Sequence, residues 1–138
     1  MTANHGYIEA SRRPGELGVH SLDHCHMAVP DLKQAHHFYD SFGLDVAEEG
    51  QGLALRTHGE AHKWVSILEG PRKKFGYLSF GLFEDDAKAF GKRLQDLAVK
   101  REDPPPGLDS NGYWFRDQDG NLIEVKVAAK TSPNEKSV

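Results

Sequence analysis

A strand-like segment, an acidic helix cap and an amphipathic helix follow one another twice in this chain, and this repeat constrains the fold more than any other feature. The first copy begins at LDHCHMAV and the second at FGYLSFGL. The candidate caps, Asp31 and Asp85, lie 54 residues apart. Because an internal repeat indicates two copies of one supersecondary unit, we expect two similar modules rather than two unrelated halves.

The first module, about residues 20–70, is predicted to contain a strand, a helix and three further strands. Leu22–Val29 is strand-like, and Pro30 ends it because proline has no N–H for a ladder hydrogen bond. Asp31 is an N-cap signal with Gln34 placed for a capping box, and Gly43 is a typical C-terminal stop. The remaining strands are expected at residues 44–48, 52–57 and 63–68.

The second module, about residues 75–129, repeats this order. We expect a strand over 75–83, a helix capped by Asp85 with apolar positions from Ala87 to Ala98, and strands over 113–117 and 122–128. A short strand can form at the start of the loop REDPPPGLDSNG. The fold class is therefore α+β: two tandem βαβββ modules form one curved mixed sheet with a central cleft, and the helices lie outside.

Size and charge fit a single soluble domain. The chain has 138 residues and a formal net charge of −4, without a basic stripe that would indicate nucleic-acid binding. It has no apolar run long enough to cross a membrane and only one cysteine, Cys25, so we expect a cytoplasmic protein. Residues 1–18 are expected to form a flexible arm, 19–129 the domain, and 130–138 a tail or an inter-domain linker.

Strand alternation separates two sets of side chains on the first, fifth and last strands. Successive side chains point to opposite faces, so the apolar sets are expected to pack under the helices. These sets are Cys25, Met27 and Val29; Leu78, Phe80 and Leu82; and Ile123, Val125 and Val127. The polar residues His24, His26, Tyr77, Ser79, Glu124 and Lys126 then share the other face.

Two motifs carry a family resemblance. LDHCHMAVPDLKQAHHFYDSFGLDV and YWFRDQDGNLIEVKV are similar to the opening and closing motifs of the vicinal oxygen chelate superfamily, with Gln118 where proline is usual. The superfamily includes glyoxalase I, bleomycin-resistance proteins and extradiol dioxygenases, and the resemblance covers about residues 20–129. It is closest to the N-terminal domain of a two-domain extradiol dioxygenase.

The resemblance implies a metal site that this chain does not fully reproduce. In the extradiol branch, two histidines and a glutamate hold Fe²⁺ as a facial triad. These positions fall on His24, Tyr77 and Glu124, so a tyrosine stands where the second histidine is expected. A neutral phenol with a pKa near 10 is a poor metal ligand. We therefore expect no metal to be bound by this chain, although His24 and Glu124 remain candidate ligands.

Four residues are candidates for ligand binding. His26 and Tyr77 lie on the face of His24. Trp64 can form an aromatic wall for a planar ligand, with core packing as the alternative for both Trp64 and Trp114. Arg56 can pair with an anionic ligand or with Glu124. The expected ligand is a small aromatic or vicinal-oxygen compound.

Three functions remain open from the sequence. The first is a non-catalytic N-terminal domain of an extradiol-dioxygenase-like protein acting on aromatic diols. The second is a stand-alone metal-dependent dioxygenase or glyoxalase-like enzyme, in which His26, Tyr77 or a partner copy completes the metal shell. The third is a resistance-type protein that binds a small ligand without chemistry. The resemblance also implies a homodimer or a tandem second domain.

Overall fold

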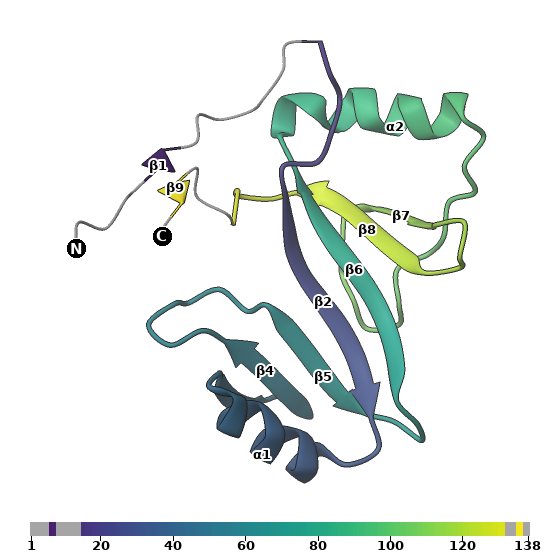
Figure 1. Cartoon of the computed structure of the whole chain (residues 1–138). Coiled ribbons are helices and arrows are strands. Elements are labelled where there is room, and N and C mark those ends of the chain that lie inside the picture. Colours follow the sequence, from purple (N-terminus) through teal and green to yellow (C-terminus); the bar gives the residue numbers. More distant parts are fainter. Residues whose placement is uncertain (1–5, 8–14, 132–134, 137–138) are drawn as a thin grey trace.

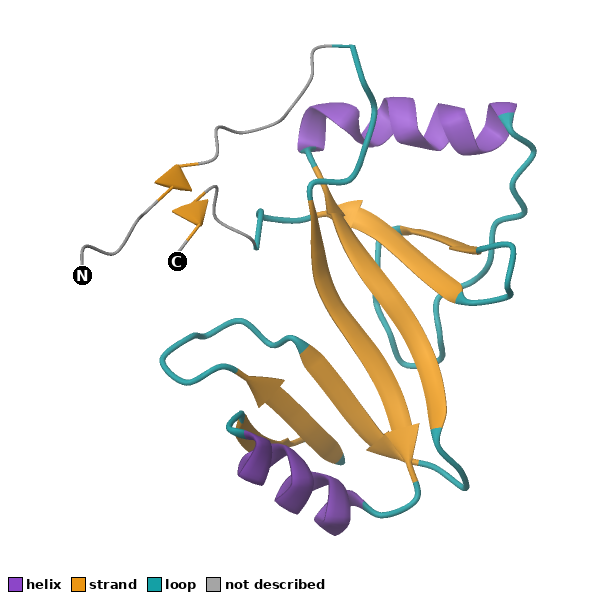
Figure 2. Cartoon of the chain, in the orientation of Figure 1, coloured by secondary structure: helices purple, strands orange, loops and turns teal. Residues whose placement is uncertain are grey.

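A seven-stranded mixed sheet forms the centre of the molecule in a computed structural model that describes residues 6–7, 15–131 and 135–136. The strand order is β3-β4-β5-β2-β6-β8-β7, and the sheet is open (Figure 1). Figure 2 shows one α-helix at each end of this sheet. The elements are β1 (Gly6–Tyr7), β2 (Ser21–Val29), α1 (Leu32–Phe42), β3 (Asp45–Glu49), β4 (Gly52–Arg56), β5 (Val65–Glu69), β6 (Lys74–Leu82), the 3₁₀ turn η1 (Glu84–Asp86), α2 (Ala87–Asp96), β7 (Tyr113–Arg116), β8 (Leu122–Val127) and β9 (Glu135–Lys136).

The two modules meet through their first strands, β2 and β6, which pair antiparallel. Within the modules, β2 runs parallel to β5, and β6 runs parallel to β8. The predicted α+β architecture of two joined modules is confirmed. Of the predicted arm and tail, the structure describes residues 6–7, 15–18, 130–131 and 135–136, and β1 and β9 pair with each other.

The second module is reduced relative to the first. Its additional strand is a single bridge between Arg101 and Phe115 instead of a ladder. Three consecutive prolines, residues 104–106, follow shortly after this bridge. Because proline cannot donate a backbone hydrogen bond, the segment cannot extend the pairing.

Helix α1 begins and ends as predicted. Asp31 has extended backbone angles, and its Oδ1 accepts a hydrogen bond from the Gln34 N–H at 3.0 Å. Gly43 has a φ of 109°, a conformation that glycine adopts without the steric penalty of a Cβ. The helix therefore occupies the segment that the sequence signals define.

The prediction that Asp85 caps the start of helix α2 was wrong. Residues Glu84–Asp86 form a 3₁₀ turn, in which the Asp86 N–H donates to the Phe83 carbonyl at 3.0 Å. This i→i+3 hydrogen bond delays the α-helix to Ala87, and Asp86 makes no side-chain cap hydrogen bond. The helix also ends at Asp96, earlier than the apolar pattern through Ala98 indicated.

Each module has its own apolar core beneath its helix. Strand alternation is confirmed for seven of the nine predicted apolar residues, and the exceptions are Cys25, which is only partly buried and belongs to neither core cluster, and Val127. Val127 ends β8, is 50% exposed and lines a cavity next to His24 instead of packing in the core. None of the helices in the described part of the chain is long and apolar enough to cross a membrane. The buried core residues are Ala35, Leu53, Leu55 and Ile67 in the first module and Leu82, Ile123 and Val125 in the second.

Candidate functional site

A row of four side chains crosses strands β2, β6, β8 and β7. His24 is the register partner of Ser79, Ser79 of Glu124, and Glu124 of Trp114. Sequence alternation placed Ser79 on this face. It did not show that Ser79, rather than Tyr77, lies directly opposite His24, because register follows from the pairing of distant strands.

His24 is held by hydrogen bonds at both ring nitrogens. Nδ1 lies 2.6 Å from Asp23 Oδ2, and Nε2 lies 3.2 Å from the Tyr77 hydroxyl. A carboxylate only accepts, so Nδ1 donates to Asp23, and in the neutral ring Nε2 accepts the Tyr77 proton. The register shifts between Leu22 and His24, at Asp23, and such a bulge can re-aim a side chain. No motif in the sequence pointed to Asp23.

Tyr77 fills the centre of the site and is only 5% exposed. Its ring meets Trp114 edge-on at 4.9 Å and stacks on His26 at 5.5 Å, both measured between centroids. Burial raises the pKa of Tyr77 to about 12, and the Glu124 and Asp23 carboxylates add to this rise. Near neutral pH the hydroxyl is therefore a protonated hydrogen-bond donor.

Glu124 is 3% exposed, and hydroxyl groups satisfy both of its oxygens. Ser79 Oγ donates to Oε1 at 2.5 Å, and Ser110 Oγ donates to Oε2. Lys126 Nζ lies 4.0 Å from Oε1 and 3.7 Å from Asp23 Oδ2, so one ammonium serves both carboxylates. Sequence reasoning missed Ser110 because its loop carries no strand periodicity.

A cavity of about 400 Å³ borders this cluster. Its walls come from His24, Tyr77, Glu124, Lys126 and the loop over residues 108–112. At Gly112 a Cβ would lie 3.0 Å from Glu124 Cγ, so the loop packs directly against the carboxylate side chain. The cavity is therefore lined by one ammonium group, two hydroxyl groups and two carboxylates, those of Asp109 and Glu124.

The residues present do not fit a facial triad. Such a site needs two imidazoles and a carboxylate with free lone pairs. Here the third position is Tyr77, His24 Nε2 bonds its hydroxyl, and serines bond both Glu124 oxygens. Across residues 6–7, 15–131 and 135–136, no group of three or more His, Cys, Asp or Glu side chains is placed to hold a metal ion.

The other candidate ligand-binding residues, His26, Arg56 and Trp64, do not line this cavity. Burial lowers the pKa of His26, and the neighbouring His24 lowers it further. Arg56 donates to Glu49 and to the Ala61 carbonyl, each at 3.1 Å, so of its two possible pairings the one with Glu124 is not formed. Arg56 lies on β4, and two strands, β5 and β2, separate it from β6. Ligand binding by His26, Tyr77, Arg56 and Trp64 stays a prediction.

The two tryptophans have different environments. Trp64 meets the His62 ring edge-on at 4.5 Å and lines a second cavity of about 530 Å³ together with Asp23. Trp114 is 1% exposed, and its Nε1–H has no hydrogen-bond partner among the described residues. Trp64 therefore faces a cavity, whereas Trp114 packs in the interior.

The fold and this face identify the class of protein. The family model of the Glyoxalase/Bleomycin resistance protein/Dioxygenase superfamily matches residues 21–125, and the chain belongs to this superfamily. The matched region contains His24, Tyr77 and Glu124.

Several of the solved structures that this chain resembles are dioxygenases. The chain is 44% identical over 119 residues to Metapyrocatechase 2 of Cupriavidus necator, covering 86% of this chain but 37% of that protein. The 2,3-dioxygenase LapB from Pseudomonas sp. KL28 has a TM-score of 0.68 at 20% identity, over 86% of this chain and 44% of LapB. A Mn(II)-bound glyoxalase from Novosphingobium aromaticivorans has a TM-score of 0.64 at 20% identity, over 80% of this chain and 39% of that one. The chain thus spans well under half the length of these relatives.

Proposed function

We propose that this chain is a non-catalytic domain of an extradiol-dioxygenase-like protein that acts on aromatic diols. The observation that carries the proposal is the Tyr77 hydroxyl, which bonds His24 Nε2 at 3.2 Å. This phenol occupies the lone pair that a metal ion would need. The domain then contributes a folded scaffold and surfaces, and the ring-cleaving chemistry belongs to a second domain.

The state of Glu124 supports the same assignment. Its two oxygens accept from Ser79 and Ser110, which are on different elements, so the carboxylate is already solvated by the protein. Metal binding would have to break at least one of these charge-assisted hydrogen bonds, each contributing about 1.5–3 kcal/mol. The absence of a second histidine and the hydrogen bonding of the Glu124 carboxylate therefore both disfavour metal binding.

The lengths of the relatives support the tandem arrangement. A protein that is 44% identical to this chain is matched over only 37% of its length, which leaves room for a further domain. We place this chain as the N-terminal domain of such a pair, with a second domain or a second copy as its partner. The aromatic-diol substrate rests on the name metapyrocatechase and is part of this proposal.

One observation favours the alternative of a metal-dependent enzyme. Metal-binding histidines usually donate their other N–H to a carboxylate, and His24 donates to Asp23 in this way. If a metal ion displaced the Tyr77 hydroxyl from His24 Nε2, the hydrogen bond from His24 Nδ1 to Asp23 would already orient the ring for metal binding. Metal titration of the chain separates the two assignments.

The test loads the purified 138-residue chain with Fe²⁺ under anaerobic conditions, removes free metal by desalting and measures bound iron. It then follows catechol ring cleavage by absorbance in the presence of O₂. We expect bound iron well below one ion per chain and no cleavage. One iron per chain with ring cleavage, both lost in His24→Ala, would overturn the proposal.

A pair of variants tests the role of Tyr77 directly. Tyr77→His supplies the missing imidazole, and Tyr77→Phe removes the hydroxyl without adding a ligand. We expect Mn²⁺ or Fe²⁺ binding to improve most in Tyr77→His, which adds a ligand, and to improve less in Tyr77→Phe, which only frees the His24 lone pair. Equal metal binding by the parent and both variants would show that Tyr77 does not block the site.

A further inference from the structure

A groove opens between helix α1 and the start of strand β6, away from the polar cluster. Its volume is about 550 Å³, within the range of small-molecule sites. Figure 1 shows the two helices at opposite ends of the sheet, with β2 and β6 crossing the space between them. None of the groove residues lines the cavity next to His24.

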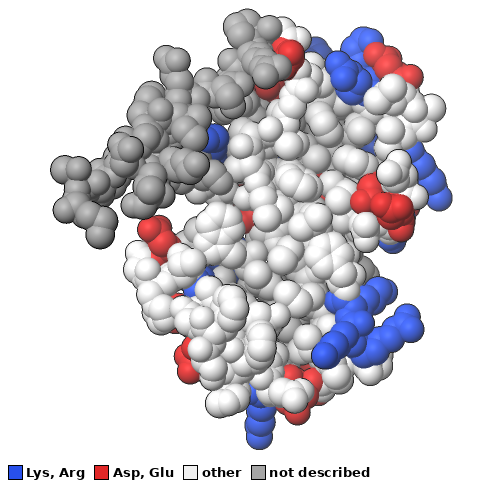
Figure 3. Space-filling model, in the orientation of Figure 1, with Lys and Arg blue, Asp and Glu red and all other residues white. Residues whose placement is uncertain are grey.

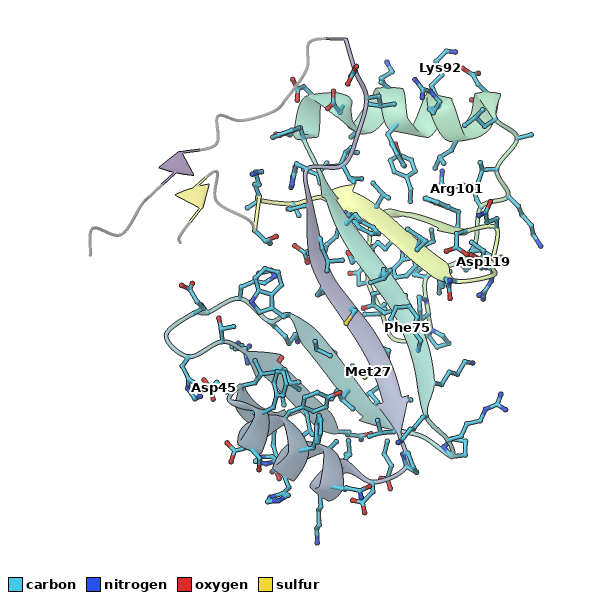
Figure 4. All side chains as sticks on the ribbon, in the orientation of Figure 1. Met27, Asp45, Phe75, Lys92, Arg101 and Asp119 are labelled. Atoms are coloured by element: carbon cyan, nitrogen blue, oxygen red, sulfur yellow. The ribbon has the colours of Figure 1, made fainter. Side chains whose placement is uncertain are left out.

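A backbone irregularity brings an aromatic ring into this groove. Met27 pairs with Phe75, whereas the preceding pair joins His26 to Tyr77, so Gly76 has no partner. A Cβ at residue 76 would lie 2.9 Å from the His26 carbonyl oxygen, so the close approach of these strands requires glycine. Figure 4 labels Met27 and Phe75 on these neighbouring strands.

Aromatic side chains form the walls of the groove. Phe38 and Tyr39 come from α1 and meet edge-on at 5.1 Å, and Phe75 comes from β6. Phe38 is 58% exposed and Phe75 is 45% exposed. The Tyr39 hydroxyl lies 4.0 Å from Met27 Sδ, so a polarisable sulfur lies beside the rings. These walls suit a planar apolar body.

Cations lie at one end of the same groove. Lys73 and Lys74 line it, and Arg72 precedes them in the turn between β5 and β6. Blue atoms gather in this region of the surface in Figure 3. Within the described part of the chain, no carboxylate lies within ion-pair distance of these three cations.

One acidic residue, Asp31, also lines the groove. Asp31 is the N-cap of α1, and its Oδ1 accepts the Gln34 N–H at 3.0 Å. Among the described residues it forms no ion pair with Lys73 or Lys74, so both ammonium groups remain available to a ligand. Apolar walls with free ammonium groups at one end match an aromatic molecule that carries a carboxylate.

We infer that this groove binds aromatic carboxylates, with the ring between Phe38, Tyr39 and Phe75 and the carboxylate at Lys73 and Lys74. The site is separate from the face that carries His24 and Glu124. The groove proposal does not depend on metal binding. A negative result for the groove therefore leaves the proposed non-catalytic function untouched, and the reverse is also true.

The probe is 2-naphthoate, with uncharged 2-naphthamide as the matched control compound. Binding to the isotope-labelled chain is followed by NMR, because both tryptophans lie outside the groove. We expect chemical-shift changes confined to residues 27–39 and 73–75, with naphthoate bound about threefold to tenfold more tightly than the amide.

Two double variants test the role of the lysines. Lys73→Ala with Lys74→Ala is expected to abolish the preference for naphthoate over the amide. Lys88→Ala with Lys100→Ala removes the same charge from exposed positions elsewhere and is expected to preserve it. Phe38→Ser is expected to weaken both compounds equally, because it removes a wall and no charge.

Four results would overturn the assignment. These are absence of naphthoate binding, equal affinity for the acid and the amide, an equal effect of the two double variants, and shifts centred on residues 108–112 or 124–126. Sedimentation at the NMR concentration provides the remaining check. A dimer whose formation protects Phe38 and Phe75 would assign the groove to an interface between copies and would also overturn the ligand site.

Discussion

The two faces of the β2–β6 strand pair have opposite characters. On one face, His24 is hydrogen-bonded to Asp23 and Tyr77, Ser79 is hydrogen-bonded to Glu124, and these side chains are largely buried. On the helix side, Met27 and Phe75 border an open groove. The same two strands thus supply a closed polar centre and an exposed apolar one.

This contrast shows how the polar groups of the closed face are satisfied. A histidine and a carboxylate buried without metal would leave lone pairs unsatisfied, which costs free energy. The Tyr77 hydroxyl and two serine hydroxyls satisfy them instead. The polar face therefore contributes to stability, whereas the open face has capacity for a ligand. Four substitutions test this division.

Trp114→Ala is expected to have the largest effect. The indole is 1% exposed and packs on Tyr77, and loss of a fully buried tryptophan costs about 3–5 kcal/mol of unfolding free energy. Trp114→Phe keeps a ring against Tyr77 and removes an N–H without a partner among the described residues, so its cost should be clearly smaller. Urea denaturation measures both, and equal costs would contradict the packing role.

Ser79→Ala is expected to lower the unfolding free energy by about 1.5–3 kcal/mol, because it removes a donor to a buried carboxylate. Ser66→Ala on strand β5, which β2 separates from β6, is the matched control, since Ser66 is half-buried and belongs to the same sheet. Chemical denaturation at neutral pH gives the comparison. A cost no greater than that of Ser66→Ala would show that Glu124 does not depend on Ser79.

Tyr77→Phe should cost about 0.5–1.5 kcal/mol, the usual net contribution of one hydrogen bond. Its pH dependence has a defined sign. The pKa of Tyr77 is about 12 in the folded chain against about 10 in an unfolded one. The stability linked to the neutral phenol is therefore fully present below pH 10 and is lost as the pH rises toward 12.

The measurement for Tyr77 is the tyrosinate absorbance of the parent minus that of Tyr77→Phe between pH 9 and pH 12.5. We expect the difference to show one group that titrates about two pH units above an ordinary tyrosine. A difference spectrum that titrates near pH 10 would mean that the hydroxyl is accessible to solvent, contrary to its buried position.

Local signals in the sequence predicted most of the fold. The Asp31 cap, the Gly43 stop and the alternation in β2 and β6 each act over a few residues, so they can be read without tertiary information. The start of α2 could not be predicted, because three consecutive acidic residues, 84–86, all resemble caps. A 3₁₀ hydrogen bond from Asp86 to Phe83 selects among them.

The candidate site was only partly predictable for the same reason. Alternation placed His24, Tyr77 and Glu124 on one face, because side-chain direction has a period of two. The partners that determine their chemistry come from elsewhere: Ser110 from a loop and Asp23 from a bulge. Contacts of this kind depend on register and loop path, which leave no periodic signal in the sequence.

Phe38→Ala tests the open face and is expected to have the smallest effect on stability. The side chain is 58% exposed, and its ring contacts are with Tyr39 and with the exposed Phe42 on the same helix. Surface substitutions of this kind change the unfolding free energy by no more than about 0.5 kcal/mol, and alanine also favours the helix. Denaturation curves of the parent and the variant should therefore nearly coincide. A loss of 2 kcal/mol or more, in the range typical of core truncation, would show that Phe38 is part of the core, and the contrast between a closed and an open face would then fail.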